Sequence, residues 1–200
     1  MTHRLYLIRH GEQLDAEHGV SDGPLSPRGR RQAQALAERL GGVPFDAAWH
    51  SPLERAAETA EIIARRMPAL QPEPSPLLFD CYPSGPAPET PSAYDAFFGS
   101  ITEAEMEAGA AQMSDAAAEF LRSSREDRHD LLITHNFVIG WFVREALGAA
   151  AWRWVSISQA HCGLTILTQK PGRPWSLLVH NDLAHLPPEL RTGLSETYAL

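Results

Sequence analysis

The chain has 200 residues, of which 44% are hydrophobic and 21% charged, and its formal net charge is −8. These values fit a single globular domain over residues 1–200, and the acidic balance excludes the broad basic surface that nucleic acids and membranes attract. Two cysteines are too few for a disulfide scaffold and suit a reducing compartment. The first apolar run is too short for a signal peptide, and no run reaches about 18 apolar residues, so we expect a cytoplasmic location and no membrane partner.

A strand and an amphipathic helix open the chain. Apolar residues run almost unbroken over residues 4–8, as in a strand that is covered on both faces. A polar loop over residues 12–24 follows. The segment "LSPRGRRQAQALAERLGG" then predicts a helix that Ser26 caps and Gly41 ends.

The middle of the chain predicts a second strand and helix, then an irregular excursion. Residues 45–50 resemble a strand, and "SPLERAAETAEIIARR" predicts a helix with a capping box from Ser51 to Glu54. Eight of the sixteen prolines fall in residues 68–91, a density that no regular helix tolerates. We therefore expect a small irregular cap around residues 68–100, followed by a helix over residues 102–122.

The last third predicts one strand–helix pair and then further strands. "DLLIT", residues 130–134, is a buried strand, and "FVIGWFVREALG" after it is a helix that ends at Gly148. Strands are expected over residues 154–158, 162–169 and 175–180, the last two joined by the turn "KPGRPW" as a hairpin.

This alternation of strands and helices predicts an α/β fold. We expect a three-layer sandwich with a mostly parallel central sheet and helices on both of its faces. The terminal hairpin should add an antiparallel edge strand, and the proline-rich excursion should form the cap.

Basic and polar side chains follow three of the predicted strands. The first strand ends at Arg9 and His10, the second is followed by Ser51 with Arg55 one turn into its helix, and the third is followed by His135. Ligands of such folds bind outside the carboxyl ends of the strands, where these side chains would meet. Two arginines, two histidines and two helix N-termini favour a tetrahedral anion, most of all a phosphoryl group.

Histidine can serve such a site as a nucleophile. Its unperturbed pKa is about 6.5, and the nearby Arg9 and Arg55 would disfavour the protonated form of His10. His10 could then attack phosphorus and form a phosphohistidine, which water hydrolyses. The nine histidines contain no H-x-H, H-E-x-x-H or Cys/His ligand spacing, so we expect no metal and no cofactor.

Several ordered motifs resemble those of the histidine phosphatase superfamily, also called phosphoglycerate mutase-like. "LIRHGE" matches its R-H-G signature, "LSPRGRRQA" and "SPLERAAETA" are similar to two further motifs, and "LLITHN" matches the strand before its second histidine. "NDLAHL" is similar to an ending common among its phosphatases. The resemblance implies that His10 is the nucleophile, and that Arg9, Arg55 and His135 bind the phosphate with a backbone N–H of Asn136.

The resemblance also suggests a proton donor. Asp80 stands where the family usually has a glutamate that protonates the leaving group, and Glu12 and Asp15 are the other candidates. Many members have Ser or Thr at the position of Gln13, which would donate a hydrogen bond in their place. The substrate-binding residues expected on this basis are Gly11, Gln13, Ser51 and Asn136.

The leading hypothesis is a metal-independent phosphatase that acts on a phosphorylated small molecule or a phosphoprotein. The walls of its substrate site should come from residues 12–23 and 68–98. A phosphoglycerate mutase stays open as an alternative, although the chain lacks the long insertions and the W-N pair of the cofactor-dependent mutases. A non-catalytic phosphate- or phosphopeptide-binding module also stays open, as does a homodimer.

Overall fold

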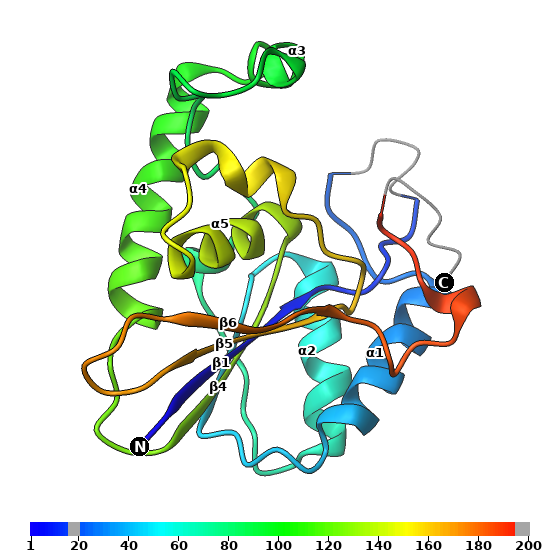
Figure 1. Ribbon diagram of the computed structural model, residues 1–200. Helices are drawn as coiled ribbons and strands as arrows, with labels where there is room; N and C mark the ends of the chain where they lie inside the picture. Colours follow the sequence, from blue (N-terminus) through cyan, green and yellow to red (C-terminus); the bar gives the residue numbers. More distant parts are fainter. Residues whose placement is uncertain (16–20, 195–200) are drawn as a thin grey trace.

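The computed structural model describes residues 1–15 and 21–194, which contain a mixed sheet of six strands (Figure 1). The strands are β1 (His3–Arg9), β2 (Ala47–His50), β3 (Glu73–Pro74), β4 (Arg128–Thr134), β5 (Leu164–Gln169) and β6 (Ser176–Asp182). Their order across the sheet is β3-β2-β4-β1-β5-β6. The first four strands run parallel, whereas β5 is antiparallel to β1 and β6 is antiparallel to β5. The predicted mostly parallel sheet with a terminal hairpin is confirmed.

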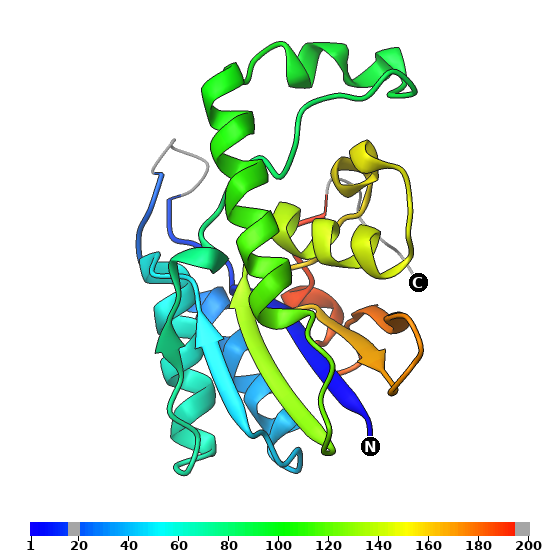
Figure 2. The same ribbon diagram turned by 90° about the vertical axis from the view of Figure 1, so that its left-hand side faces the viewer.

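Helices cover both faces of this sheet, as expected for three layers. They are α1 (Pro27–Leu40), α2 (Glu54–Arg66), α3 (Asp95–Phe98), α4 (Glu103–Phe120) and α5 (Asn136–Ala146). Both views place α1 and α2 on one face and α4 and α5 on the other (Figures 1 and 2). Short 3-10 helices occupy residues 76–78, 92–94, 151–156 and 188–190. That residues 1–200 form one domain stays a prediction.

The unbroken apolar run of β1 is explained by the two cores that it separates. Leu5 and Leu7 pack into the core beneath α4 and α5, whereas Tyr6 and Ile8 pack into the core beneath α1 and α2. Successive side chains of a strand point to opposite faces, so a central strand needs apolar residues at every position. This burial on both sides fixes where β1 ends, and therefore where His10 lies.

The predicted capping box of α2 is wrong. The helix begins at Glu54, and its N-cap is Leu53, which is extended with a ψ of 140° and makes no side-chain cap bond. The carboxylate of Asp22 caps the helix instead, since its two oxygens lie 3.1 and 3.2 Å from the Glu54 nitrogen. The hydroxyl of Ser51 instead bonds to the His135 ring.

The strand expected over residues 154–158 is also wrong. Residues 151–156 form a 3-10 helix, in which Trp154 is fully buried against α5 and the cap. A short apolar run rich in aromatic and β-branched residues fits a buried strand and a buried helical turn equally well.

Conversely, the short edge strand β3 was not expected, because it lies within the proline-rich segment. Pro74 is tolerated there since β3 is an edge strand.

Only part of the predicted cap around residues 68–100 lies at the far end of α4 from the sheet, because residues 73–74 form β3 within the sheet. In both views the segment that contains α3 extends beyond the layers of the sandwich (Figures 1 and 2). Its chain crosses α4 at Gly109, where a Cβ atom would overlap the carbonyl oxygen of Tyr82. Aromatic rings then join the cap to the body, because Phe97 packs edge-on against Phe137 and Trp154. Gly109 thus permits a close contact that a side chain would block.

Candidate active site

The structure brings the side chains that follow β1, β2 and β4 together at one edge of the sheet. Arg9 ends β1 opposite Thr134 of β4, which places His10 and His135 side by side with ring centroids 5.1 Å apart. Arg55, from the first turn of α2, lies between them. Its Nε is 3.1 Å from His10 Nε2, and its Nη2 is 3.3 Å from His135 Nδ1.

The hydrogen bonds of His10 fix its tautomer. Its Nδ1 lies 2.7 Å from the carbonyl oxygen of Gly11, which can only accept, so Nδ1 carries the proton. Its Nε2 faces the Nε–H of Arg55, which can only donate. The lone pair of a neutral His10 therefore lies on Nε2, directed toward the guanidinium of Arg55.

His135 has the opposite arrangement. Its Nδ1 faces the guanidinium of Arg55 and therefore accepts, which leaves the proton of a neutral ring on Nε2. That Nε2 lies 2.8 Å from the hydroxyl oxygen of Ser51, to which it donates. Ser51 thus orients the ring of His135.

Arg9 is held by backbone carbonyl groups. Its Nη1 donates to the carbonyl oxygens of Gln159 and Gly193, at 2.6 and 2.7 Å. The Gln159 nitrogen in turn donates to the side-chain oxygen of Asn136, at 2.7 Å. The buried Nε of Arg9 has no hydrogen-bond partner in the described part of the chain. A buried N–H of this kind needs an acceptor, and an anion bound at this edge would supply one.

Burial and positive neighbours keep the histidines uncharged. Burial lowers the pKa of His10 well below its ordinary value, and Arg9 and Arg55 lower it further, against the hydrogen bond to Gly11. The pKa of His135 is also well below its ordinary value, through burial and then through His10 and Arg55. Burial lowers the pKa of Arg9 to about 10, so its guanidinium stays charged at neutral pH.

Asp80 lies at the rim of the same group. Its Oδ2 is 3.3 Å from Arg55 Nη2 and 3.7 Å from His135 Nδ1. Partial burial raises the pKa of this carboxyl group, although Arg55 and Arg9 act in the opposite direction. The side chain is still 44% exposed, so it can reach a substrate and exchange protons with solvent.

The other candidate acids lie in different surroundings. Glu12 accepts a hydrogen bond from the hydroxyl of Ser26 at 2.7 Å and pairs with Arg28 at 3.2 Å, so its carboxylate supports the start of α1. Asp15 adopts a left-handed backbone with a φ of 55°, next to residues outside the described part. Among the three candidates, Asp80 is the carboxyl group placed beside His135.

Two expected substrate-binding residues have structural contacts. The backbone N–H of Gly11 donates to the hydroxyl of Thr59 at 3.0 Å, which ties the loop after β1 to α2. Gln13 is buried and pairs with Leu25 in an isolated antiparallel bridge. Their roles in substrate binding stay predictions. The expected wall over residues 12–23 lies partly outside the described residues.

Two residues of the site were missed by sequence reasoning. Asp22 contacts Arg55, with its Oδ1 3.2 Å from Nη1, in addition to capping α2. His161 lies beside His10, with ring centroids 5.6 Å apart. It comes just before β5, whose antiparallel direction brings its first residue, Leu164, level with Ile8 at the carboxyl end of β1. The predicted terminal hairpin was the signal that could have identified His161, because an antiparallel strand beside β1 begins at the edge of the sheet where β1 ends.

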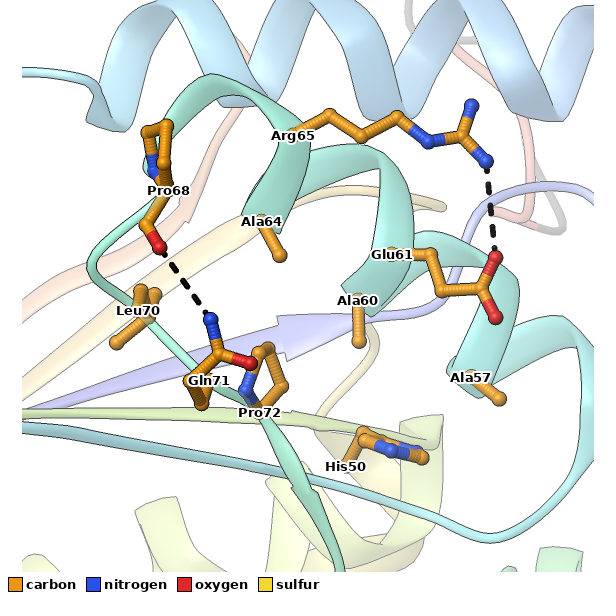
Figure 3. Close-up of a pocket in the computed structure, with 10 residues that line it drawn as sticks. All are labelled: His50, Ala57, Ala60, Glu61, Ala64, Arg65, Pro68, Leu70, Gln71 and Pro72. Carbon is orange, nitrogen blue, oxygen red and sulfur yellow. Dashed lines mark hydrogen bonds and ion pairs between the residues drawn. The ribbon is translucent and has the colours of Figure 1, made fainter.

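A separate groove of about 510 Å³ lies beside α2 and β3 (Figure 3). Its lining residues are His50, Ala57, Ala60, Glu61, Ala64, Arg65, Pro68, Leu70, Gln71 and Pro72. Most of its walls are small or apolar, and its cation, Arg65, pairs with Glu61 at 3.7 Å. None of the predicted catalytic residues lines this groove.

In the described part of the chain, no three His, Cys, Asp or Glu side chains are grouped as metal ligands would be.

Known proteins share both the sequence pattern and the fold. The sequence profile of the histidine phosphatase superfamily (branch 1) matches residues 5–183. The mitochondrial serine/threonine-protein phosphatase Pgam5 of Caenorhabditis elegans is 34% identical over 94% of this chain, and its human counterpart is 29% identical over the same share. The chain spans 65% of the length of each of these relatives. The solved structure of the alpha-ribazole phosphatase from Shigella flexneri is 22% identical, with a TM-score of 0.71 over 90% of this chain and 96% of that one.

These comparisons correct the expected cytoplasmic location. The Caenorhabditis and human relatives are named as mitochondrial proteins, and none of the comparisons supports a cytoplasmic location. Within residues 1–15 and 21–194, no helix combines the length and apolar character needed to cross a membrane.

Proposed function

The chain belongs to the histidine phosphatase superfamily, and we propose on that basis that it hydrolyses phosphomonoesters through a phosphohistidine on His10. The observation that carries this proposal is the arrangement around the neutral His10 ring. Its Nε2 lone pair faces Arg55, its Nδ1 proton is held by Gly11, and Arg9 offers a buried N–H without a partner in the described part of the chain.

In the first step the phosphoryl group displaces the hydrogen bonds from Arg55 to the rings of His10 and His135. Arg55 turns its N–H groups from the two histidine rings to phosphoryl oxygens, which frees Nε2 of His10 to attack phosphorus. A bond forms between Nε2 and phosphorus as the bond to the leaving oxygen breaks. Asp80, whose pKa burial raises, is the carboxyl group proposed to give a proton to that oxygen.

In the second step water replaces the imidazole on phosphorus. The Asp80 carboxylate takes a proton from the attacking water, the P–N bond breaks, and inorganic phosphate leaves. The hydrogen bond from Nδ1 to Gly11 stabilises the positive ring of the phosphohistidine. Arg9, Arg55 and His135 stabilise the charge on the equatorial oxygens in both steps.

The substrate proposed is a phosphorylated small molecule or a phosphoprotein. The name of the Caenorhabditis relative supports a phosphoprotein, and the name of the Shigella structure supports a small molecule. A homodimer stays a prediction, as does the absence of nucleic-acid and membrane partners. The alternative of a mutase uses the same site chemistry and differs in the acceptor of the phosphoryl group, which is a second substrate hydroxyl in place of water.

The central test is turnover of p-nitrophenyl phosphate in excess EDTA. We expect hydrolysis by the wild type, loss of hydrolysis in His10→Ala, and wild-type rates in His129→Asn, which changes a histidine at the opposite end of β4. Rapid acid quench should leave no phosphoenzyme, whereas alkaline quench should preserve one on His10. Loss of activity on chelation would contradict the metal-independent mechanism, and full activity of His10→Ala would contradict the nucleophile.

Two further assays separate the alternatives. Incubation with 3-phosphoglycerate distinguishes a mutase, which isomerises it, from a hydrolase, which releases inorganic phosphate. Binding of inorganic phosphate without turnover of any phosphomonoester would identify a binding module. A panel of phosphorylated metabolites and phosphopeptides, compared by kcat/KM, would then assign the substrate class.

A further inference from the structure

A third imidazole lies at the site. His161 precedes β5, and the antiparallel pairing of β5 with β1 brings it to the edge where His10 and Arg9 lie. Its ring centroid is 5.6 Å from that of His10. The mechanism proposed for His10 gives this ring no role.

A chain of hydrogen bonds orients the hydroxyl group of Thr192, which contacts the ring of His161. The backbone N–H of Glu12 donates to the side-chain oxygen of Gln32 at 2.8 Å, which fixes the direction of that amide. The Gln32 Nε2 then donates to the carbonyl oxygen of Leu190 and to the hydroxyl oxygen of Thr192, at 2.7 and 2.8 Å. The hydroxyl of Thr192 therefore accepts from Gln32 and keeps its own proton to donate.

The Nδ1 of His161 is placed to accept that proton. The Nδ1 of His161 lies 3.0 Å from the Thr192 hydroxyl, and the His161 backbone N–H donates to the Thr192 carbonyl at 2.9 Å. With the hydroxyl as donor, Nδ1 accepts and the proton of the neutral ring lies on Nε2. Burial, and then Arg9 and His10, lowers the pKa of His161 well below its ordinary value, which keeps the ring neutral.

The segment after Thr192 fits against the same two side chains. Gly193 has a φ of +89°, and a Cβ on it would lie 2.7 Å from His161 Nδ1 and 2.9 Å from Arg9 Nη1. The carbonyl oxygen of Gly193 accepts from that Arg9 nitrogen. The segment thus holds Arg9 and His161 together. Within residues 1–15 and 21–194, the hydrogen bond of the His161 ring is made by Nδ1 and none is made by Nε2, so the Nε2–H remains available to a ligand.

We propose that His161 is a third imidazole ligand of the phosphoryl group, donating from Nε2–H to one of its oxygens beside His10. The proposal rests on the proposed function, because it assigns a further residue to the same site. Thr192 is a positioning residue, which acts by holding the Nδ1 of His161 as an acceptor.

The test measures binding of inorganic phosphate by calorimetry, with orthovanadate inhibition and kcat/KM for p-nitrophenyl phosphate as further readouts. We expect His161→Ala to weaken phosphate binding by about tenfold or more, the loss typical of a hydrogen bond to a charged group. Thr192→Val should weaken it less, and Thr192→Ser, which keeps the hydroxyl, should restore it. His129→Asn is the matched control and should bind as the wild type does.

Two outcomes would overturn the proposal. One is phosphate binding by the folded His161→Ala variant within twofold of the wild type, whether or not its melting temperature is lower. The other is a ¹⁵N NMR spectrum in which the free enzyme has His161 protonated on Nδ1. A fold role alone would lower the melting temperature of His161→Ala but leave the phosphate affinity of the folded protein unchanged. Failure of the proposed function would differ, because the wild type itself would then show no turnover, whatever the effect of His161.

Discussion

At the scale of single residues, the charge state of His10 governs the proposed chemistry. Burial and then Arg9 and Arg55 place its pKa well below the ordinary 6.5. We therefore expect ¹⁵N NMR of the free enzyme to show a neutral His10, protonated on Nδ1, at pH 6.5 and below. Removing one positive charge in Arg55→Ala should raise the pKa of His10. A wild-type His10 that titrates at or above pH 6.5 would contradict this account of the site.

Asp80 provides the second prediction at this scale. A carboxyl group with a raised pKa can protonate a leaving oxygen, and poor leaving groups need that proton most. For Asp80→Asn we expect kcat/KM to fall about 10²-fold or more with an alkyl phosphate, and far less with p-nitrophenyl phosphate. Asp95→Asn, at an exposed position in the cap, is the control. Equal losses for both substrates would remove Asp80 from the acid role.

At the scale of elements, the sequence predicted the strand ends better than the contacts between loops. Buried apolar runs located the ends of β1 and β4, and the strand predicted over residues 45–50 ends where β2 does. With the expected parallel sheet, these three ends were enough to place His10, Arg55 and His135 together. The capping of α2 could not be predicted, because Asp22 lies more than thirty residues before Glu54 in the chain. His161 was missed because ligands were sought only after parallel strands, whereas an antiparallel strand begins at that same edge.

Asp22 links a loop to a helix, and its loss should show in stability. Asp22→Ala removes the acceptor for the Glu54 N–H and an ion pair with Arg55. We expect the free energy of unfolding, measured by urea titration, to fall by about 1 kcal/mol, as for other lost N-caps. Asn also caps helices well, so Asp22→Asn should recover most of this loss. If Asp22→Ala unfolds at the wild-type urea concentration, the cap is not supplied by Asp22.

At the scale of the whole molecule, the layers followed from the sequence and the irregular parts did not. Residues such as Leu36 of α1 and Phe142 of α5 follow the helical period, and the expectation of helices on both faces of the sheet is confirmed. The turn around Trp154 and the path of the cap depend on which distant rings bury one another. The periodic pattern of apolar residues along the chain cannot predict such contacts between distant rings.

A buried charge cluster at the opposite end of the sheet from the site joins several of these elements. Asp130 of β4 accepts from His3 of β1 at 2.9 Å and from Arg128 at 2.7 Å. The ring of His3 lies edge-on to Trp175, which precedes β6, with centroids 5.0 Å apart. Burial alone would raise the pKa of Asp130, but the hydrogen bonds from His3 and Arg128 outweigh it and lower the pKa below the ordinary 3.8.

This lowered pKa predicts how the stability of the whole fold depends on pH. A carboxyl group whose pKa is lower in the folded state stabilises the protein above its unfolded pKa, and this contribution is lost as the pH falls through the folded value. At pH 7 we expect Asp130→Asn to lower the free energy of unfolding by about 3 kcal/mol, since it leaves buried donors without their charged partner. Below pH 3.8 the difference between wild type and variant should shrink. Asp127→Asn, at a carboxylate that is 72% exposed, serves as the control and should leave the profile unchanged. A difference between wild type and Asp130→Asn that stays constant from pH 7 to pH 2 would show that the ionised carboxylate does not stabilise the sheet.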